Sequence, residues 1–306
     1  MTLKEDLVST PERPVITGQT VFAWSHDGRP FVVPIEQFGT GAVVLFLPAP
    51  STVSTREEWR TVAMALADQF TVVLIDWPGF GGASRPAVAY TAHLYQAFLQ
   101  DFVRQHLSRT SAAVVAAGHA AGYVLRLAAA GDATWSRAVL AAPTWRGPLP
   151  TVMGEHARLY RTLRAVVRTP GIGHALYRLN TSRRFLGFML GRHVFSDPVK
   201  LTPELLAKKQ SSARQRGARF AAAAFVSGAL DPFADRESWV EALRVVRFPV
   251  QLVIGDRTPP KSRVEMAALA EACPRPPLVV RGALGLHEEC AHALVGPLRA
   301  FLAGVN

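Results

Sequence analysis

A run of small and apolar residues from 111 to 131 constrains the fold more than any other part of the chain. It predicts a buried strand over residues 112–117, a tight turn at Gly118, and a helix that continues to about residue 130. The run is long enough to cross a membrane, but His119, Arg126 and two turn glycines interrupt it. We therefore interpret it as a strand, a turn and a helix inside a globular domain.

Strand and helix patterns alternate on both sides of this run. Apolar runs predict strands at 20–24, 29–35, 43–47, 71–75, 137–141, 250–254 and 278–281. Helical spacing predicts helices at 55–66, 90–107, 235–245, 262–272 and 288–302. At the start of the first helix, Thr55 and Glu58 have the spacing of a capping box. The alternation predicts an α/β fold with a mostly parallel central sheet flanked by helices.

Residues 145–230 interrupt the alternation, because they show helical patterns and no strand pattern. We expect a core built from residues 1–144 and 231–306, and an inserted helical cap, or lid, built from residues 145–230. Open α/β sheets bind ligands at the carboxyl ends of their strands. The cap is therefore expected to cover that edge of the sheet.

The charge and the cysteines limit the classes of partner. The net charge is +11, and residues 155–219 hold 14 Lys and Arg against 3 acidic residues, so the excess belongs to the cap. Cys273 and Cys290 form neither a disulfide framework nor a metal set, which predicts a reducing, cytoplasmic location. Residues 1–16 are polar and lack the apolar segment of a secretory signal. With no phosphate loop or dinucleotide fingerprint, we expect no metal and no cofactor.

Three short motifs are spread along the chain. They are residues 76–86 (DWPGFGGASRP), Gly118-His119-Ala120-Ala121-Gly122, and Gly285-Leu286-His287-Glu288. In this order and spacing the chain resembles the α/β-hydrolase fold family over nearly its whole length. It is also similar to a group of uncharacterised hydrolase-like proteins of photosynthetic organisms, on the strength of residues 52–57, 76–81 and 285–289. These resemblances imply a fold and do not by themselves give a reaction.

The family carries a nucleophilic serine in a strained turn with the pattern G-x-S-x-G. In this chain Ala120 stands at the serine position, and a methyl group cannot attack a carbonyl. The family's oxyanion hole also uses an N–H of the turn after the third strand, where Pro48 and Pro50 have none. This leaves Ala49 or Ser51 as donors. An engineered serine-to-alanine change would explain the elbow alone, whereas the altered turn favours a natural difference.

The resemblance makes His287 the catalytic histidine, with Asp256 or Asp231 as its acid. Family members often carry the acid three residues after a glycine that follows the seventh strand. Here that position is Thr258, and Asp256 comes two residues earlier. Asp231 is the alternative, because some members carry the acid after the sixth strand. His119 is expected to pack beneath the turn as a buried histidine.

Four aromatic residues fall at the predicted carboxyl edge of the sheet. Together with His119 and Ala121, a pocket there would be lined by Trp77, Phe80, Tyr123 and Trp145. Ordinary packing is the alternative for each of them taken singly.

A basic helix is predicted in the cap. Its arginines, spaced by three, three and four residues on one face, are Arg158, Arg161, Arg164 and Arg168. Such a face contacts solvent, an acidic ligand or an anionic membrane surface. Nucleic acid is not expected as a partner, because no nucleic-acid-binding motif accompanies the charge. The oligomeric state is left open.

Three functions are compatible with this pattern. The first is a hydrolase-like protein without the serine nucleophile, unable to perform ordinary serine ester hydrolysis, that binds a hydrophobic or acidic small molecule beneath the basic cap. The alternative is an enzyme in which His287, with Asp256 or Asp231, acts as a general base in lyase chemistry, proton abstraction or water-mediated hydrolysis. The second alternative is a module that binds a membrane surface or a protein partner.

Overall fold

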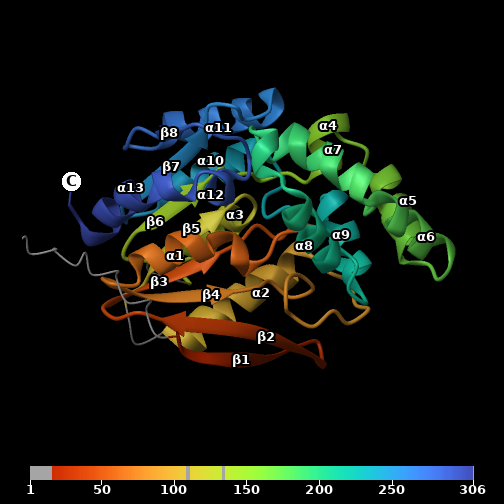
Figure 1. The fold of residues 1–306 in the computed structure, drawn as a ribbon, viewed down its shortest axis with the longest axis horizontal. Coiled ribbons are helices and arrows are strands. Elements are labelled where there is room, and N and C mark those ends of the chain that lie inside the picture. The colour runs from red at the N-terminus through yellow and green to blue at the C-terminus, as the bar shows by residue number, and fades with distance from the viewer. Residues whose placement is uncertain (1–15, 108–110, 133–134, 306) are drawn as a thin grey trace, which may run out of the picture.

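The computed structural model describes residues 16–107, 111–132 and 135–305, and an eight-stranded sheet forms their centre (Figure 1). The polar N-terminal residues 1–15 lie outside the described part. The strands, in sheet order, are β1 (Ile16–His26), β2 (Arg29–Phe38), β4 (Phe70–Ile75), β3 (Ala42–Leu47), β5 (Ala113–Ala117), β6 (Ala138–Ala141), β7 (Val250–Gly255) and β8 (Leu278–Val280). Strand β2 is antiparallel to β1 and β4, and the other pairs are parallel. This confirms the predicted mostly parallel sheet.

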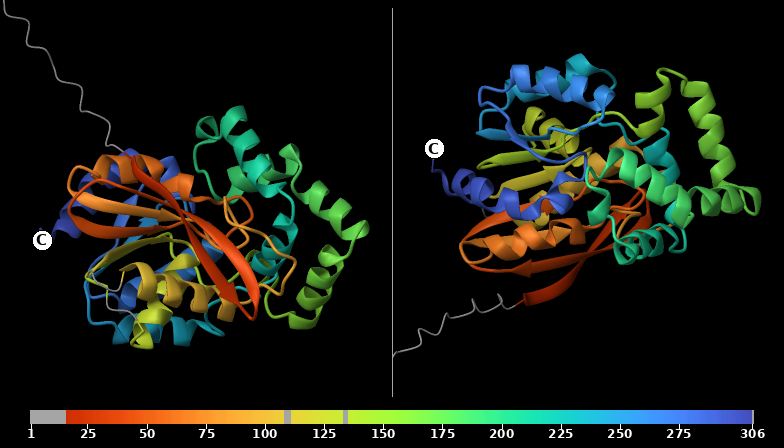
Figure 2. Two further views of the ribbon diagram at one scale, coloured as in Figure 1. Left: turned by 90° about the horizontal axis from the view of Figure 1, so that it is seen from below. Right: turned by 45° about the horizontal axis from the view of Figure 1, so that its top comes forward.

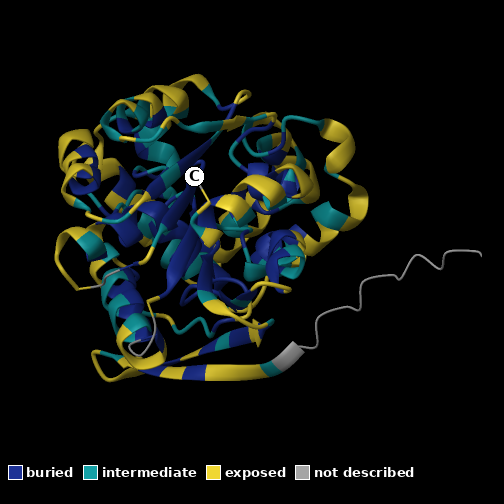
Figure 3. Ribbon diagram, turned by 90° about the vertical axis from the view of Figure 1, so that its left-hand side faces the viewer, coloured by how far each residue is buried: buried dark blue, intermediate teal, exposed yellow. Residues whose placement is uncertain are grey.

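Helices cover both faces of the sheet. Helices α1 (Arg60–Leu66) and α13 (Ala291–Ala303) contribute to the core on one face. Helices α2 (Ala92–Phe102), α3 (Ala120–Ala129) and α10 (Arg236–Val245) contribute to the core on the other. Strand β5 points Val114 and Ala116 to one core and Val115 and Ala117 to the other. Burial of both faces accounts for its continuously apolar sequence. Strands at the centre of the molecule are coloured as buried in Figure 3.

The chain between β6 and α10 forms helices throughout its regular part, as predicted for residues 145–230. They are α4 (Pro148–Met153), α5 (Ala157–Arg168), α6 (Ile172–Asn180), α7 (Arg183–His193), a 3-10 turn (Pro198–Lys200), α8 (Pro203–Ala213) and α9 (Ala218–Val226). Helices α5 and α6 lie at the outer edge of this cap in both views of Figure 2. Helix α11 (Pro260–Ala272) follows β7.

The predicted turns and helix ends agree with the structure in some places and differ in others. Asp27 (φ 48°) and Gly28 (φ 69°) are left-handed, as expected for the hairpin turn between β1 and β2. The predicted helix at 55–66 begins as a 3-10 turn, η1 (Arg56–Trp59), and the Thr55 side chain makes no capping hydrogen bond, so the capping-box interpretation is wrong. The π-helical turn η2 (Val103–Leu107) continues α2, and the closing helix divides into α12 (Leu286–Glu289) and α13. No helix among the described residues is both long and apolar enough to cross a membrane.

Candidate functional site

The turn between β5 and α3 is centred on Gly118. Gly118 follows the last residue of β5 and has a φ of +53°, whereas His119 has a φ of −62° and helical geometry. Ala120 is the first residue of α3 and is fully buried. The nucleophile of this fold sits on the strained residue of the turn, and a positive φ marks that residue here as Gly118. The strained residue of the turn is thus Gly118, two residues before Ala120, where the sequence pattern predicted it.

The tip of this turn faces the loop after β3. A Cβ added to Gly118 would lie 3.0 Å from the Ala49 Cβ and 3.6 Å from the Thr144 Oγ1. Within the described residues, neither the Ala49 N–H nor the His119 N–H donates a hydrogen bond, so both are available to a bound oxygen atom. Ser51 is a poorer donor than the sequence predicted. Its N–H bonds the Ala49 carbonyl at 2.8 Å, and its hydroxyl bonds a neighbouring serine at 2.6 Å.

His287 is buried, and its expected acid partner is wrong. Its Nε2 lies 3.1 Å from Glu58 Oε2, and its ring packs on Trp59 with the ring centroids 4.7 Å apart. Asp256 is exposed and accepts a hydrogen bond from the Gly282 N–H at 3.0 Å. The acid position three residues after the glycine holds Thr258, which is fully buried. The Thr258 hydroxyl and the His287 Nδ1 both lack a hydrogen-bond partner among the described residues.

Lys209 of α8 brings the cap onto this histidine. Its buried Nζ lies 2.5 Å from Glu58 Oε1 and 2.6 Å from Glu288 Oε2. Burial tends to raise the pKa of Glu58, but attraction to Lys209 and the hydrogen bond with His287 outweigh it and lower the pKa from 4.5 to about 2. Burial raises the pKa of Glu288. The side chains of His287, Glu58, Lys209 and Glu288 are thus linked in one row between cap and core.

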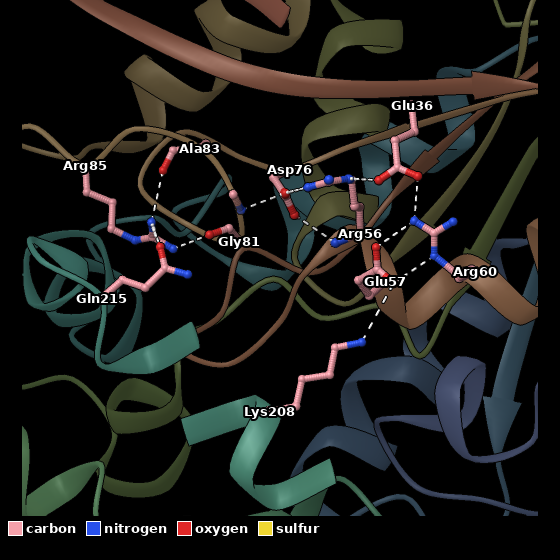
Figure 4. Close-up of polar contacts among 11 residues, drawn as sticks. Glu36, Arg56, Glu57, Arg60, Asp76, Gly81, Ala83, Arg85, Lys208 and Gln215 are labelled. Carbon is pink, nitrogen blue, oxygen red and sulfur yellow. Dashed lines mark hydrogen bonds and ion pairs between the residues drawn. The ribbon is translucent and has the colours of Figure 1, made fainter. Parts of the chain in front are cut away.

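A second ion-pair network holds η1 against the sheet (Figure 4). Arg56 donates to the buried carboxylates of Asp76 and Glu36, and Arg60 reaches Glu36 from the next turn. Asp76, the first residue of the 76–86 motif, also accepts a hydrogen bond from the Gly82 N–H at 2.8 Å. The motif therefore acts as an anchor. It fixes the helical turn from which the carboxylate partner of the histidine comes.

His119 links the turn to both ends of the cap. Its Nδ1 lies 2.9 Å from Thr144 Oγ1, where the cap begins, and its Nε2 lies 3.1 Å from Asp231 Oδ1, where the cap ends. Asp231 also accepts a hydrogen bond from the Gly147 N–H at 2.7 Å. His119 is buried, as expected. Asp231, one of the two aspartates predicted as the partner of His287, is therefore the partner of His119.

Three of the four aromatic residues expected at the pocket are packing residues. The side chains of Trp77, Phe80 and Tyr123 lie in the core. The indole N–H of Trp77 bonds the Pro48 carbonyl at 2.6 Å, and the Tyr123 hydroxyl bonds the Leu230 carbonyl at 2.6 Å. Ala121 is also buried. Trp145, which was expected in the pocket, and Asp231, which was expected as the acid partner of His287, do line a cavity.

This cavity is open to solvent, has a volume of about 770 Å³, and lies between the cap and the core. Its wall combines four arginines, two acidic residues and aromatic rings, namely Arg126, Arg146, Arg161, Arg164, Glu155, Asp231, Trp145, Tyr160 and Phe233. Arg146 pairs with Glu155 and lies over the Trp145 ring. In the described part of the chain, Arg161 and Arg164 have no acidic partner. Burial and the neighbouring cations Arg168 and Arg161 lower the pKa of Arg164, so the site favours an anion.

Helix α5 turns two of its four arginines, Arg164 and Arg168, toward the protein, and its leucines are exposed. Arg164 donates to the Ser227 hydroxyl, and Arg168 donates to the Val88 carbonyl at 2.7 Å and stacks on Phe220. By contrast, Leu159 and Leu163 are 44% and 41% exposed. The expectation that the four arginines form one outward face is therefore wrong for Arg164 and Arg168. Across residues 16–107, 111–132 and 135–305, no three His, Cys, Asp or Glu side chains are placed to hold a metal ion.

The sheet order, the strand-to-helix turn and the helical insertion agree with the family that the sequence matches. Residues 44–296 match the model of the alpha/beta hydrolase family, and the chain belongs to that family. No curated protein sequence matches the chain significantly.

Several solved structures share the fold. Cfl2 from Burkholderia cenocepacia is 22% identical, with a TM-score of 0.70 over 96% of this chain and 98% of that one. The haloalkane dehalogenase DatA from Agrobacterium tumefaciens is 18% identical, with a TM-score of 0.69 over 95% and 98%. A bromoperoxidase from Bacillus anthracis is 18% identical, with a TM-score of 0.69 over 93% and 100%. At these identities the likeness concerns the fold alone.

Proposed function

We propose that this protein binds an anionic small molecule in the cavity between cap and core, and that it does not hydrolyse esters through a nucleophile at the β5–α3 turn. The observation that carries the proposal is the wall of the cavity, where four arginines outnumber two acidic residues and the half-buried Arg164 has no acidic partner in the described residues. A cation that is partly buried without a counter-ion favours the binding of an anion.

Two features of the structure, one at the turn and one at His287, support the absence of serine-type hydrolysis. The strained position holds Gly118, which has no side chain to attack a carbonyl. The Nε2 of His287, the atom that would accept a proton from a nucleophile, is bonded to Glu58. The carboxylate is in turn bound by Lys209 from the cap. A histidine held in this network is not positioned as the base of a catalytic triad.

The lining indicates the chemical class of the ligand. Guanidinium groups bind carboxylates and phosphates through charge-assisted hydrogen bonds. The rings of Trp145, Tyr160 and Phe233 offer an apolar surface beside these groups. We therefore expect a carboxylate or phosphate that carries an apolar body.

Titration calorimetry with decanoate and with decanol tests this proposal, because the two probes differ in charge and share their chain. Charge-assisted hydrogen bonds contribute about 1.5–3 kcal/mol, so decanoate should bind about tenfold or more tightly than decanol. The double variant Arg161→Met/Arg164→Met should lose this preference. Arg158→Met is the matched control, because Arg158 lies on the same helix and does not line the cavity. Equal binding of both probes, or ester hydrolysis that His287→Ala abolishes, would contradict the proposal.

The hydrogen-bonded chain Thr144–His119–Asp231 favours a second candidate function, acyl transfer by a threonine. In this reaction the Thr144 oxygen attacks an ester carbonyl and its proton passes to His119 Nδ1, while Asp231 holds the other ring nitrogen. The leaving alcohol takes that proton, and water then releases the acyl group. Intact-mass analysis after treatment with a fluorophosphonate tests it. A single adduct that is lost in Thr144→Val and kept in Thr144→Ser supports this function, and an unmodified wild type rejects it.

A further inference from the structure

The outer face of the cap is unusually apolar for a surface in contact with water. Ten of the 16 large apolar side chains that are exposed in the described residues fall within residues 152–199. Seven of them come from three consecutive helices and are Leu159, Leu163, Ile172, Leu176, Leu179, Phe185 and Phe188. Exposed apolar side chains concentrated in this way mark a site of interaction. We call these seven side chains the cap face.

The side chains are arranged on the helices as an amphipathic surface requires. On α6, Ile172 and Leu179 are seven residues apart and therefore share one side of the helix, and they are 71% and 68% exposed. The opposite side of α6 holds Tyr177, whose hydroxyl bonds the Ala213 carbonyl of α8 at 2.8 Å. Helix α6 is thus held by one side only. Its apolar side has no cover within the described chain.

The segment that carries the cap face is rich in cations. Residues 156–196 contain eight arginines and no Asp or Glu. On α7, the exposed Arg184 and Arg192 lie on the same side as Phe185 and Phe188, because their spacings fall within one helical stripe. The buried side of α7 carries Leu186 and Leu190. The helix therefore presents aromatic rings flanked by guanidinium groups.

We propose that the cap face docks on an anionic lipid membrane surface. Apolar side chains enter the boundary between headgroups and acyl chains, while arginines bind the anionic headgroups. A second copy of this chain fits poorly, since a symmetric contact would bring arginines against arginines. The protein lies on the membrane and does not span it through a described helix. Docking is independent of the ligand cavity, because Arg164 faces inward while Ile172, Leu179 and Phe188 face outward.

Flotation with lipid vesicles tests the proposal on the full chain. One set of vesicles is phosphatidylcholine, and in the other about a third of the lipid is phosphatidylglycerol. Each arginine close to the membrane surface strengthens binding about fivefold. If three arginines contact headgroups, the protein should prefer the anionic vesicles by roughly a hundredfold. The triple variant Ile172→Glu/Leu179→Glu/Phe188→Glu should lose binding. Val264→Glu is the matched control, as Val264 is 56% exposed on α11, outside the cap.

A double variant Arg184→Gln/Arg192→Gln separates the contribution of charge from that of the apolar side chains. It should lower the preference for anionic vesicles by roughly tenfold or more and leave the apolar contact in place. We expect the variants to fold, because exposed positions tolerate substitution, and circular dichroism checks this. Absence of wild-type binding, equal binding to both kinds of vesicle, or unchanged binding of the triple variant overturns the proposal. A dimer in solution that the triple variant disperses would show instead that a second copy covers the cap face.

Discussion

Replacing Lys209 by methionine should strongly destabilise the protein at neutral pH. The ammonium group is buried and lies 2.5 Å from Glu58 and 2.6 Å from Glu288. Methionine preserves the length of the side chain and removes the charge, so two carboxylates are left facing each other in a buried site. Loss of one partner of a buried ion pair costs about 3–5 kcal/mol.

The Glu58 pKa gives the magnitude for Lys209 and His287 together. A fall from 4.5 to about 2 corresponds to about 3 kcal/mol of stability for the charged state. Because the folded pKa is depressed, this contribution is complete above the unfolded value of 4.5 and is lost as the pH falls toward 2. The raised pKa of Glu288 acts in the opposite sense and reduces the net effect.

Urea unfolding of wild type, Lys209→Met and Lys208→Met at pH 7 and at lower pH provides the assay. Lys208 is the matched control, since its side chain is 62% exposed and its ammonium lies 3.7 Å from the Glu57 carboxylate. Its loss should cost less than about 1 kcal/mol. The difference between wild type and Lys209→Met should narrow as the pH falls below 4.5. Equal midpoints for the two variants at pH 7, or a difference that does not change with pH, would refute the reasoning.

Three further predictions concern the β5–α3 turn and its surroundings. Gly118→Ser should lower stability by about 1–3 kcal/mol in urea without creating esterase activity, because of the positive φ and the nearby Ala49 Cβ. His119→Ala should cost about 2–3 kcal/mol and speed limited proteolysis within the cap, because it leaves the Asp231 carboxylate without its histidine partner. Asp256→Asn should change both the unfolding midpoint and decanoate binding very little, since the exposed side chain only accepts one backbone hydrogen bond; a loss of binding would restore Asp256 as a site residue.

The fold could be predicted because it depends on local patterns. Continuous apolar runs identify strands that are buried on both faces, as in β5, and helical spacing identifies the layers around them. The hairpin between β1 and β2 follows from Asp27 and Gly28, the residue types that accept a left-handed conformation.

The site could not be predicted to the same degree, for two different reasons. The turn was misplaced because Gly118 and Gly122 match the spacing of the family pattern, while the positive φ falls on Gly118 alone. A second small-residue frame, with Ala116 and Ala120 two residues on either side of Gly118, was the signal that could have corrected it. The partner of His287 had no local signal, since Glu58 lies 229 residues away in the sequence.

The orientation of α5 shows a further limit of sequence patterns. Amphipathic spacing defines two faces of a helix and does not say which one meets the protein. Guanidinium groups can face inward where they find partners, and Arg168 finds both a backbone carbonyl and the Phe220 ring. The leucines of α5 are left on the outside as a result.

A crystal structure of the protein with a brominated decanoate would test the central claim most directly, because the bromine and the carboxylate can both be located in the density. The account predicts that the carboxylate lies within hydrogen-bonding distance of Arg161 and Arg164, with the chain against Trp145 and Tyr160. A carboxylate bound instead beside Gly118, or a cavity that stays without ligand at saturating concentration, would contradict it.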